Sequence, residues 1–339
     1  MNDKKLNLII GWLCFLISFI VYYLTAEPTV SFWDTGEYIT TSAKLQVGHP
    51  PGAPLYQMLG AIFSIFAVEK ENIGFTMNLM SGFASALTIS FMYWSIVIIL
   101  KKLTSNIKDT IKKELMVSGS AFIGSISFAF TDTFWFSAVE TEVYAMATLI
   151  MAIMFYLGLR WEIDMHEAKG DKWLLLICFV IGLSFGVHFM GLLVIPAIVM
   201  IYYFKNQEEI LKSLNLKPII GFIIANAIGI AILMGIFKLL LPNTLKFFSA
   251  TELLFVNNLG LPFNSGTLAA FIFIIYVFYF LINYTRKKGF VSANTFTLCF
   301  LFIFIGFSSW LILPIRANAD VVVNENDPSN ARELLAYYN

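Results

Sequence analysis

Residues 173–204 read WLLLICFVIGLSFGVHFMGLLVIPAIVMIYYF, and none of these 32 side chains carries a formal charge. A bilayer-spanning helix needs only about 20 apolar residues, so this run is too long for one ordinary span. The segment 184–188 interrupts the run near its middle, which predicts a tight hairpin of two short, tilted spans at roughly 173–188 and 190–204. The hairpin decides the fold, because it determines on which side of a membrane every later loop lies.

Seven further apolar stretches flank the hairpin, so the sequence predicts an all-α integral membrane protein with about nine transmembrane helices. These stretches lie at roughly 6–24, 75–100, 115–131, 141–159, 218–241, 267–284 and 292–313. The composition agrees, since 58% of the 339 residues are hydrophobic, only 13% are charged and the mean hydropathy is +0.77. The first stretch lacks a cleavage site and is expected to remain as a helix. The net charge of zero gives no general attraction for nucleic acid.

Basic residues predict the orientation of these spans. With the hairpin counted as two spans, 16 of the 22 Lys and Arg residues fall on one side of the membrane. They are Lys4 and Lys5, the five lysines of 101–113, Arg160, Lys169, Lys172, Lys205, Lys212, Lys217, Arg286, Lys287 and Lys288. The positive-inside rule places that side in the cytosol, together with the N-terminus. The remaining loops are then expected on the non-cytosolic side.

One apolar segment does not fit the pattern of spans. Residues 54–68 read PLYQMLGAIFSIFAV, and a crossing by these 15 residues would place the lysine-rich 101–113 loop outside. We therefore expect a helix that lies in the outer interface. The first external loop, 26–74, then becomes the longest connection and is expected to be functional. The predicted organisation is a transmembrane domain over 1–313 and an external tail over 314–339 that begins a further C-terminal region.

Two acids open the first external loop. Asp34 and Glu37 are three residues apart, so a helix that starts near Asp34 places both carboxylates on one face. Their residue types suit acid–base chemistry. The alternative is that Asp34 only caps the helix and Glu37 is a solvated acid in its first turn.

The segment His49-Pro50-Pro51-Gly52 follows the acids. Two prolines favour the first turn of a helix, and the free N–H groups at a helix N-terminus suit a phosphate. The sequence therefore predicts that this segment opens the second interfacial helix and binds substrate through His49 and Pro50. The alternative is a rigid corner with His49 in solvent.

Four more polar residues fall on the predicted outer side. Glu140 and Glu142 lie at the start of a span, where they either cap it or bind substrate. His188 lies at the apex of the predicted hairpin, where it either satisfies backbone carbonyls or binds substrate. Arg316 follows the last span, where it either reaches the headgroups or holds a phosphate. The convergence of these residues with Asp34, Glu37 and His49 on one face predicts a substrate site there.

Several stretches resemble a bacterial membrane family related to the protein O-mannosyltransferases and to the GT-C class of glycosyltransferases. They are WDTGEYITTSAKLQVGHPPGAPLY (33–56), FSAVETEVYAM (136–146), GVHFMGLL (186–193), FVNNLGLPFNSG (255–266) and the NENDPSN tail (324–330). Members of that family continue into a long soluble region, so the resemblance implies an N-terminal fragment of a longer chain. It also implies a bacterial inner-membrane protein with its active site in the periplasm.

The resemblance implies an enzyme that moves a sugar, with mannose as one candidate, from a polyprenyl-phosphate carrier to an acceptor hydroxyl on the outer face. By the same resemblance Asp34 corresponds to the essential acid of the first loop, Glu37 to a second acid, and His49-Pro50 to part of a His-Pro-Pro segment. Known O-mannosyltransferases carry adjacent Asp-Glu, so the spacing of Asp34 and Glu37 departs from theirs. The acceptor is a protein serine or threonine, a glycan or a lipid.

The chemistry requires few groups. Asp34 is expected to act as the general base of a single, inverting displacement, and Arg316 and His49 to contact the phosphate. Glu140, Glu142 and His188 are expected to orient the acceptor or the sugar. No metal-binding Asp-x-Asp motif or other cofactor motif is present in the sequence. The alternative function is a polytopic transporter or lipid flippase, which would place its charges near the membrane midplane instead.

Overall fold

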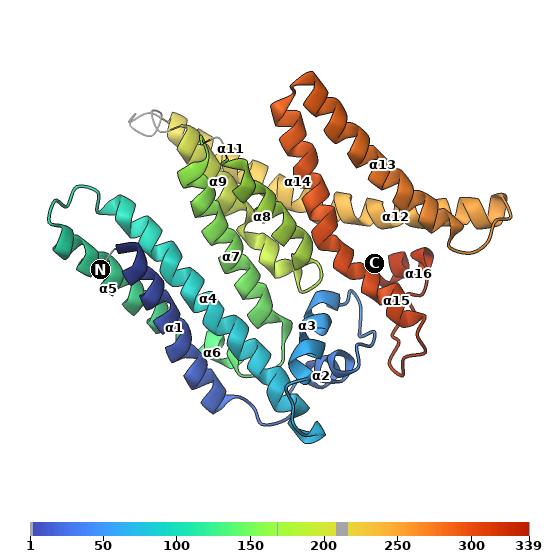
Figure 1. Ribbon diagram of the computed structural model, residues 1–339, viewed down its shortest axis with the longest axis horizontal. Coiled ribbons are helices and arrows are strands. Elements are labelled where there is room, and N and C mark those ends of the chain that lie inside the picture. The colour runs from blue at the N-terminus through green and yellow to red at the C-terminus, as the bar shows by residue number, and fades with distance from the viewer. Residues whose placement is uncertain (1–2, 168, 208–215, 339) are drawn as a thin grey trace. The chain divides into compact units, whose positions relative to one another are not determined.

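The computed structural model describes residues 3–167, 169–207 and 216–338. Every regular element of these residues is helical, and one isolated bridge joins Val47 to Asn324 (Figure 1). This confirms the predicted all-α membrane fold. Lys212, one of the basic residues used to orient the chain, lies outside the described residues. The chain divides into two compact units: the first comprises Met1–Lys44, Tyr56–Ile163 and His188–Gly191, and the second Leu45–Leu55, Asp164–Val187 and Leu192–Asn339.

Three long helices form the core of the first unit. Its elements are α1 (Asp3–Thr25), α2 (Thr35–Ala43), most of α3 (Pro54–Ser64), η1 (Lys70–Asn72), α4 (Ile73–Leu103), α5 (Thr110–Ala129), α6 (Asp132–Ala138), α7 (Val143–Asp164) and the start of η2 (Phe189–Val194). α1 and α5 pack against α4 (Figure 1). The Ser90 hydroxyl donates to the carbonyl of Gly11 over 2.8 Å, and the Tyr22 hydroxyl donates to that of Ala129 over 2.8 Å. These polar side chains are thereby satisfied inside an apolar bundle.

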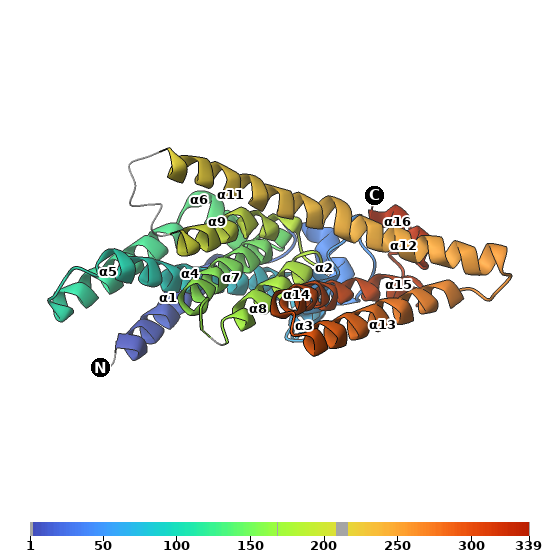
Figure 2. The same cartoon turned by 90° about the horizontal axis from the view of Figure 1, so that it is seen from above.

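The second unit contains the remaining helices. They are α8 (Asp171–Ser184), α9 (Ile195–Asn206), α11 (Lys217–Met234), η3 (Gly235–Leu240), α12 (Leu241–Leu253), η4 (Leu254–Asn258), α13 (Ser265–Lys288), α14 (Val291–Phe307), η5 (Ser308–Leu311), α15 (Ile312–Ala317) and α16 (Ala331–Tyr338). The stretch from α11 to η4 is one continuous helical segment of 42 residues, with π-helical turns at η3 and η4 (Figure 2). At 1.5 Å per residue it is about 63 Å long, twice the roughly 30 Å of bilayer hydrocarbon. It must therefore tilt strongly or extend out of the hydrocarbon.

A glycine contact joins α8 to α14. A Cβ built on Gly306 would lie 2.3 Å from the carbonyl oxygen of Phe179 and 2.8 Å from the Cα of Gly182. The obstructing atoms belong to the backbone and cannot rotate away. Only glycine at these two positions allows the helix axes to approach this closely, as in other membrane helix pairs with small residues at the contact.

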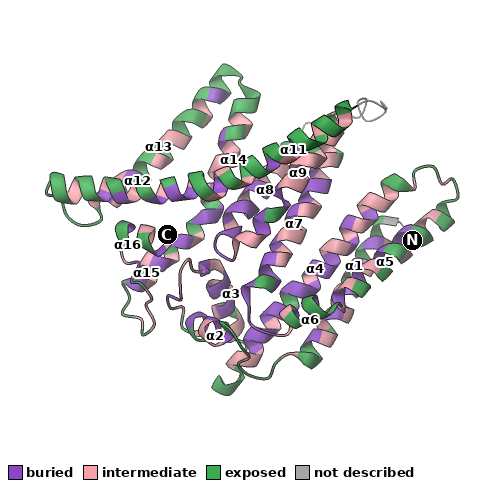
Figure 3. Ribbon diagram, turned by 180° about the vertical axis from the view of Figure 1, so that it is seen from behind, coloured by how far each residue is buried: buried purple, intermediate pink, exposed green. Residues whose placement is uncertain are grey.

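A buried carboxylate joins α12 to α13. Glu252 accepts hydrogen bonds from the backbone N–H groups of Asn264 and Thr267, over 2.6 and 2.7 Å, and from the Thr267 hydroxyl over 2.9 Å. The first turn of α13 is thus capped by a side chain of the neighbouring helix. Most of α13 beyond this turn is exposed and apolar, as expected of a lipid-facing span (Figure 3).

All nine predicted spans correspond to helices, but fewer are long enough to cross a membrane. Among the described residues seven helical segments pass a test of length and hydropathy, and the α5–α6 pair, bent by 68°, adds an eighth. α8 has 14 residues, because it ends at Ser184 and not near residue 188. α2 and α3 are short helices of the first loop, as predicted, and their place in the outer interface stays a prediction. Three sets of boundaries also stay predictions: those of the loop at 26–74, the domain at 1–313 and the tail at 314–339.

Candidate functional site

The chain that leads into α2 is held by polar contacts within the first unit. Asn78 of α4 is fully buried, and its amide group donates to the carbonyls of Glu27 and Thr29 over 2.7 and 2.8 Å. Its carbonyl oxygen accepts from the Thr141 hydroxyl over 2.6 Å. The Ser31 hydroxyl donates to Oε2 of Glu140 over 2.8 Å. One amide side chain therefore joins the start of the first loop to the connection between α6 and α7.

Asp34 occupies the N-cap position of α2. Its carbonyl accepts from the backbone N–H of Tyr38 over 2.9 Å, but its carboxylate accepts no hydrogen bond from the described first-turn N–H groups of that helix. Trp33, immediately before it, has a φ of 59°, an uncommon conformation that turns the chain at this point. The Asp34 side chain is exposed, and Glu37 lies half-buried in the first turn. The interpretation of Asp34 as a simple cap is therefore not supported.

Glu140 and Glu142 are buried, at 4% and 5% exposure, just before α7 begins at Val143. Burial, followed by the charges of Asp34 and Glu140, raises the pKa of Glu142 to about 7. Hydrogen bonds from the backbone N–H groups of Asp34 and Val143 oppose this shift. Its Oε1 atom is buried and has no hydrogen-bond partner among the residues that the structure describes. Asp34, Glu140 and Glu142 thus form one group of acids, as the sequence predicts.

The raised pKa of Glu142 predicts how stability depends on pH. An acid whose pKa is about 7 in the folded chain and 4.5 in the unfolded chain binds its proton more tightly when folded. The free energy of unfolding should therefore fall as the pH rises from about 4.5 to about 7, by at most about 3 kcal/mol. Thermal unfolding in micelles at a series of pH values measures this slope. Glu142→Gln should flatten it and Glu71→Gln, at an exposed position, should not; an unchanged slope in Glu142→Gln would contradict the assignment.

Two tyrosines that the sequence analysis did not select lie beside the acids. The rings of Tyr38 and Tyr56 are 5.2 Å apart between centroids, in an edge-to-face arrangement, and both side chains are buried. Burial raises the pKa of both phenols, and the negative charge of Glu142 raises it further. Tyr38 also responds to the charges of Asp34 and Glu37. The two rings thus pack on each other close to the carboxylates.

His188 belongs to the first unit and is half-buried. Its Nδ1 accepts a hydrogen bond from the backbone N–H of Met190 over 3.1 Å, so in the neutral ring the proton lies on Nε2. Burial lowers its pKa. Its ring packs against Tyr144 and Phe189, at centroid distances of 5.4 and 4.8 Å. The interpretation of His188 as a partner of backbone carbonyls is therefore wrong for Nδ1, because the partner of this atom is a backbone N–H group.

His49 and Pro50 lie in the second unit, in a turn that ends before α3 begins at Pro54. The prediction that this segment opens the helix is wrong, because Gly52, with a φ of 78°, turns the chain first. The turn is held from far along the sequence: the Tyr337 hydroxyl of α16 donates to the carbonyls of Gly48 and His49. The geometry supports the alternative of a rigid corner, although His49 is half-buried and not fully in solvent, and the substrate contacts of this corner stay a prediction.

Arg316 also supports this corner. It lies in the last turn of α15, so it belongs to the final helical segment and does not follow it as predicted. Its Nε donates to the carbonyl of Leu45 over 2.6 Å. Next to it the backbone N–H of Val47 donates to the carbonyl of Val323 over 3.1 Å, and the Gln46 side chain accepts from the Val323 N–H over 2.9 Å. Arg316 thus has a structural role that the sequence analysis did not predict.

The predicted site residues are therefore divided between the two compact units. Asp34, Glu37, Glu140, Glu142 and His188 belong to the first unit, and His49, Pro50 and Arg316 to the second. Asn78 could have been found from the sequence, because it is an amide inside an apolar span. No three His, Cys, Asp or Glu side chains among the described residues lie where they could hold a metal ion.

Comparison with known proteins places this geometry in a family. Residues 34–211, which include both pairs of acids, match the model of the "Protein O-mannosyl-transferase TMEM260 N-terminal domain". The chain is 22% identical over 240 residues to "Protein O-mannosyl-transferase tmem260" of Dictyostelium discoideum, covering 67% of this chain and 27% of that protein. It is 24% identical over 207 residues to the TMEM260 protein of Mus musculus that has the same description, covering 60% of this chain and 27% of the mouse protein.

The chain thus spans about a quarter of the length of the curated relatives that it matches. No solved structure matches it. The family match covers more than half of the chain and contains most of the first loop, including its acids. The chain belongs to the family defined by the TMEM260 N-terminal domain of the protein O-mannosyl-transferases.

Proposed function

We propose that the chain forms the membrane part of a glycosyltransferase that moves a sugar from a polyprenyl-phosphate carrier to a serine or threonine hydroxyl of a protein. The observation that carries the proposal is the position of Asp34, an exposed acid that does not cap its helix and lies beside two buried acids. The names of the two relatives support protein as the acceptor and mannose as the sugar.

Asp34 acts as the general base in this proposal. The acceptor hydroxyl loses its proton to the carboxylate as its oxygen attacks the anomeric carbon of the sugar. The bond from that carbon to the carrier phosphate breaks in the same displacement, so the anomeric configuration inverts.

The leaving group is a phosphate anion and needs positive charge or N–H donors more than an acid. Arg316 and His49 are proposed to contact this phosphate. Pro50 is proposed to shape the turn that contains His49 and precedes α3. Glu37, Glu140, Glu142 and His188 are proposed to orient the sugar or the acceptor, and Tyr38 to pack against the sugar ring. No metal ion or other cofactor has a role in this proposal.

The active site is proposed to face the outer side of the membrane, which in a bacterium is the periplasm. A cysteine at position 108 should then resist an impermeant thiol reagent in intact cells, and a cysteine at position 264 should be labelled. Cys14, Cys178 and Cys299 are removed first, and the same two variants in opened vesicles serve as the control. Labelling of position 108 in intact cells would contradict the proposed orientation and place the acids in the cytosol.

Transfer itself is the direct test of the function. The full-length protein in micelles is supplied with a panel of polyprenyl-phosphate sugars and a serine- and threonine-rich peptide, and the mass of the peptide is measured. A gain of one hexose that requires the lipid-linked donor supports the proposal. Consumption of the donor with no modified peptide would favour a lipid or glycan acceptor, and no consumption of any donor would contradict the proposed activity.

A further inference from the structure

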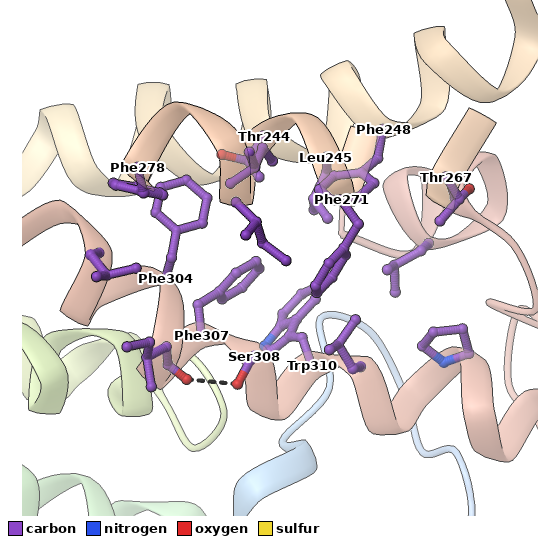
Figure 4. Close-up of a pocket in the computed structure, with 18 of the residues that line it drawn as sticks. Thr244, Leu245, Phe248, Thr267, Phe271, Phe278, Phe304, Phe307, Ser308 and Trp310 are labelled. Atoms are coloured by element: carbon purple, nitrogen blue, oxygen red, sulfur yellow. Dashed lines mark hydrogen bonds between the residues drawn. The ribbon is translucent and has the colours of Figure 1, made fainter. Parts of the chain in front are cut away.

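A pocket of about 560 Å³ lies within the second unit, between α12, α13, α14 and the segment that runs through α15 to α16 (Figure 4). Phe271 and Phe278 of α13, Phe304 and Phe307 of α14, and Trp310 of η5 point into it. The crossing of the long α12 segment with the α13–α14 hairpin leaves this space, which side chains do not fill. None of the acids of the candidate site is among its lining residues.

The chemistry of the lining excludes most ligands. None of the residues that line the pocket is charged. Several polar groups in its wall already bond within the protein: the hydroxyl of Thr244 to Leu240, that of Ser308 to Ile305, and that of Thr267 to Glu252. A charged headgroup or a free sugar would find few partners, and water is not retained in a void of this character. A peptide would bring backbone N–H and C=O groups that this wall could not satisfy.

Hydrocarbon is the one class of ligand that this lining still favours, and the helices that form the pocket lie in the hydrocarbon of the membrane. α13 and the segment of α14 to α15 are both long and apolar enough to cross a membrane. The outer face of α13 is exposed and apolar, with Phe273 at 55% and Phe280 at 52% exposure. A void of this size left empty would remove the packing contacts of its lining, which makes an empty pocket unfavourable.

We infer that this pocket is a binding site for one acyl chain of a bilayer phospholipid. The uncharged lining accepts hydrocarbon and leaves any headgroup outside the pocket, and bilayer lipids are present in large excess over any polyprenyl phosphate. The bound acyl chain lies against Ala331 and Leu334 and so stabilises the position of α16. α16 in turn contacts η3 and η5, because the Tyr338 hydroxyl donates to the carbonyl of Phe237 over 3.2 Å and its ring packs on Trp310.

Trp310 is a natural reporter for such a chain. Its indole is only 3% exposed and is fixed by a hydrogen bond of 2.8 Å from Nε1 to the carbonyl of Phe185. The test uses the whole chain in vesicles of phosphatidylcholine that contain a phosphatidylcholine with a photoreactive diazirine in its acyl chain. After irradiation, mass spectrometry locates the labelled residues. We expect label on both Trp310 and the lipid-facing Phe273, whereas label on Phe273 alone would overturn the inference.

A filled pocket provides the control. Ala331→Phe adds a ring within the pocket and should reduce the label on Trp310 at least tenfold, with Phe273 unchanged. Ala319→Phe, at an exposed position outside the pocket, should leave both labels unchanged. If Ala331→Phe does not fold, Leu334→Trp replaces it. Label on Trp310 that persists in a folded filled variant would overturn the site.

Competition identifies the source of the chain. A fivefold excess of unlabelled polyprenyl phosphate over the photoreactive lipid should leave the Trp310 label unchanged. Loss of the label would show that the pocket belongs to the carrier of the proposed sugar donor, and would overturn the assignment to a bilayer lipid. None of these measurements reads sugar transfer, so they stand whether or not the proposed function holds.

Discussion

Replacing Asp34 with asparagine should slow sugar transfer about 10²- to 10⁴-fold, the usual contribution of a general base. The substitution keeps the size of the side chain but removes its ability to accept a proton. The chain should remain folded, because Asp34 is exposed and its carboxylate does not cap the first turn of α2. Turnover number and donor KM, measured separately, should show the loss in the turnover number alone.

Asp132→Asn provides the matched control. Asp132 is also an exposed acid at the start of a short helix, α6, and its replacement should leave turnover unchanged. Near-normal turnover in Asp34→Asn, with turnover abolished in Glu37→Gln or Glu140→Gln, would move the base to another acid. If all three variants are active, the acids have no part in proton transfer.

Replacing Gly306 with alanine should destabilise the chain by about 1–3 kcal/mol, the range for overpacking a tight contact. The new methyl group would lie 2.3 Å from the carbonyl oxygen of Phe179, and relief requires α8 and α14 to separate. Because Trp310 and the pocket wall follow α14 in the chain, the disturbance should extend to them. Unfolding in denaturant, followed in mixed micelles, measures the loss.

Gly119→Ala serves as the comparison. A Cβ at Gly119 of α5 would meet no atom within 4 Å, so alanine there should be neutral or stabilise the chain by up to about 1 kcal/mol. The difference between the two variants isolates the helix contact from the general effect of alanine in a helix. Equal stability of the two would show that α8 and α14 are not in the close contact described.

The positions of the transmembrane helices could be predicted from the sequence, because the length and hydropathy of a segment decide whether it can cross a membrane. α13 begins within two residues of the predicted 267 and ends at a basic triplet, as the pattern requires. α8 differs, because hydropathy does not report where backbone hydrogen bonding stops. The apolar run continues past Ser184, but the helix ends there.

The acids of the site could be predicted because they stand out in apolar surroundings. Glu140 and Glu142 lie directly before a span, and Asp34 opens a polar stretch. The support of the His49 corner could not be predicted, since Tyr337 is an ordinary aromatic residue in the tail. Its role depends on a hydroxyl that meets a carbonyl 288 residues away, and no local pattern contains that information.

The link between Arg316 and Leu45 also has a consequence for the order of events during synthesis. The two residues are 271 positions apart. At about 5–20 residues per second, a ribosome needs roughly 14–54 s after adding Leu45 to reach Arg316. During that time the chain from α3 to α14 is made and can enter the membrane, while the carbonyls of Leu45, Gly48 and His49 still lack their donors. The His49 corner is therefore among the last parts of this chain to become ordered.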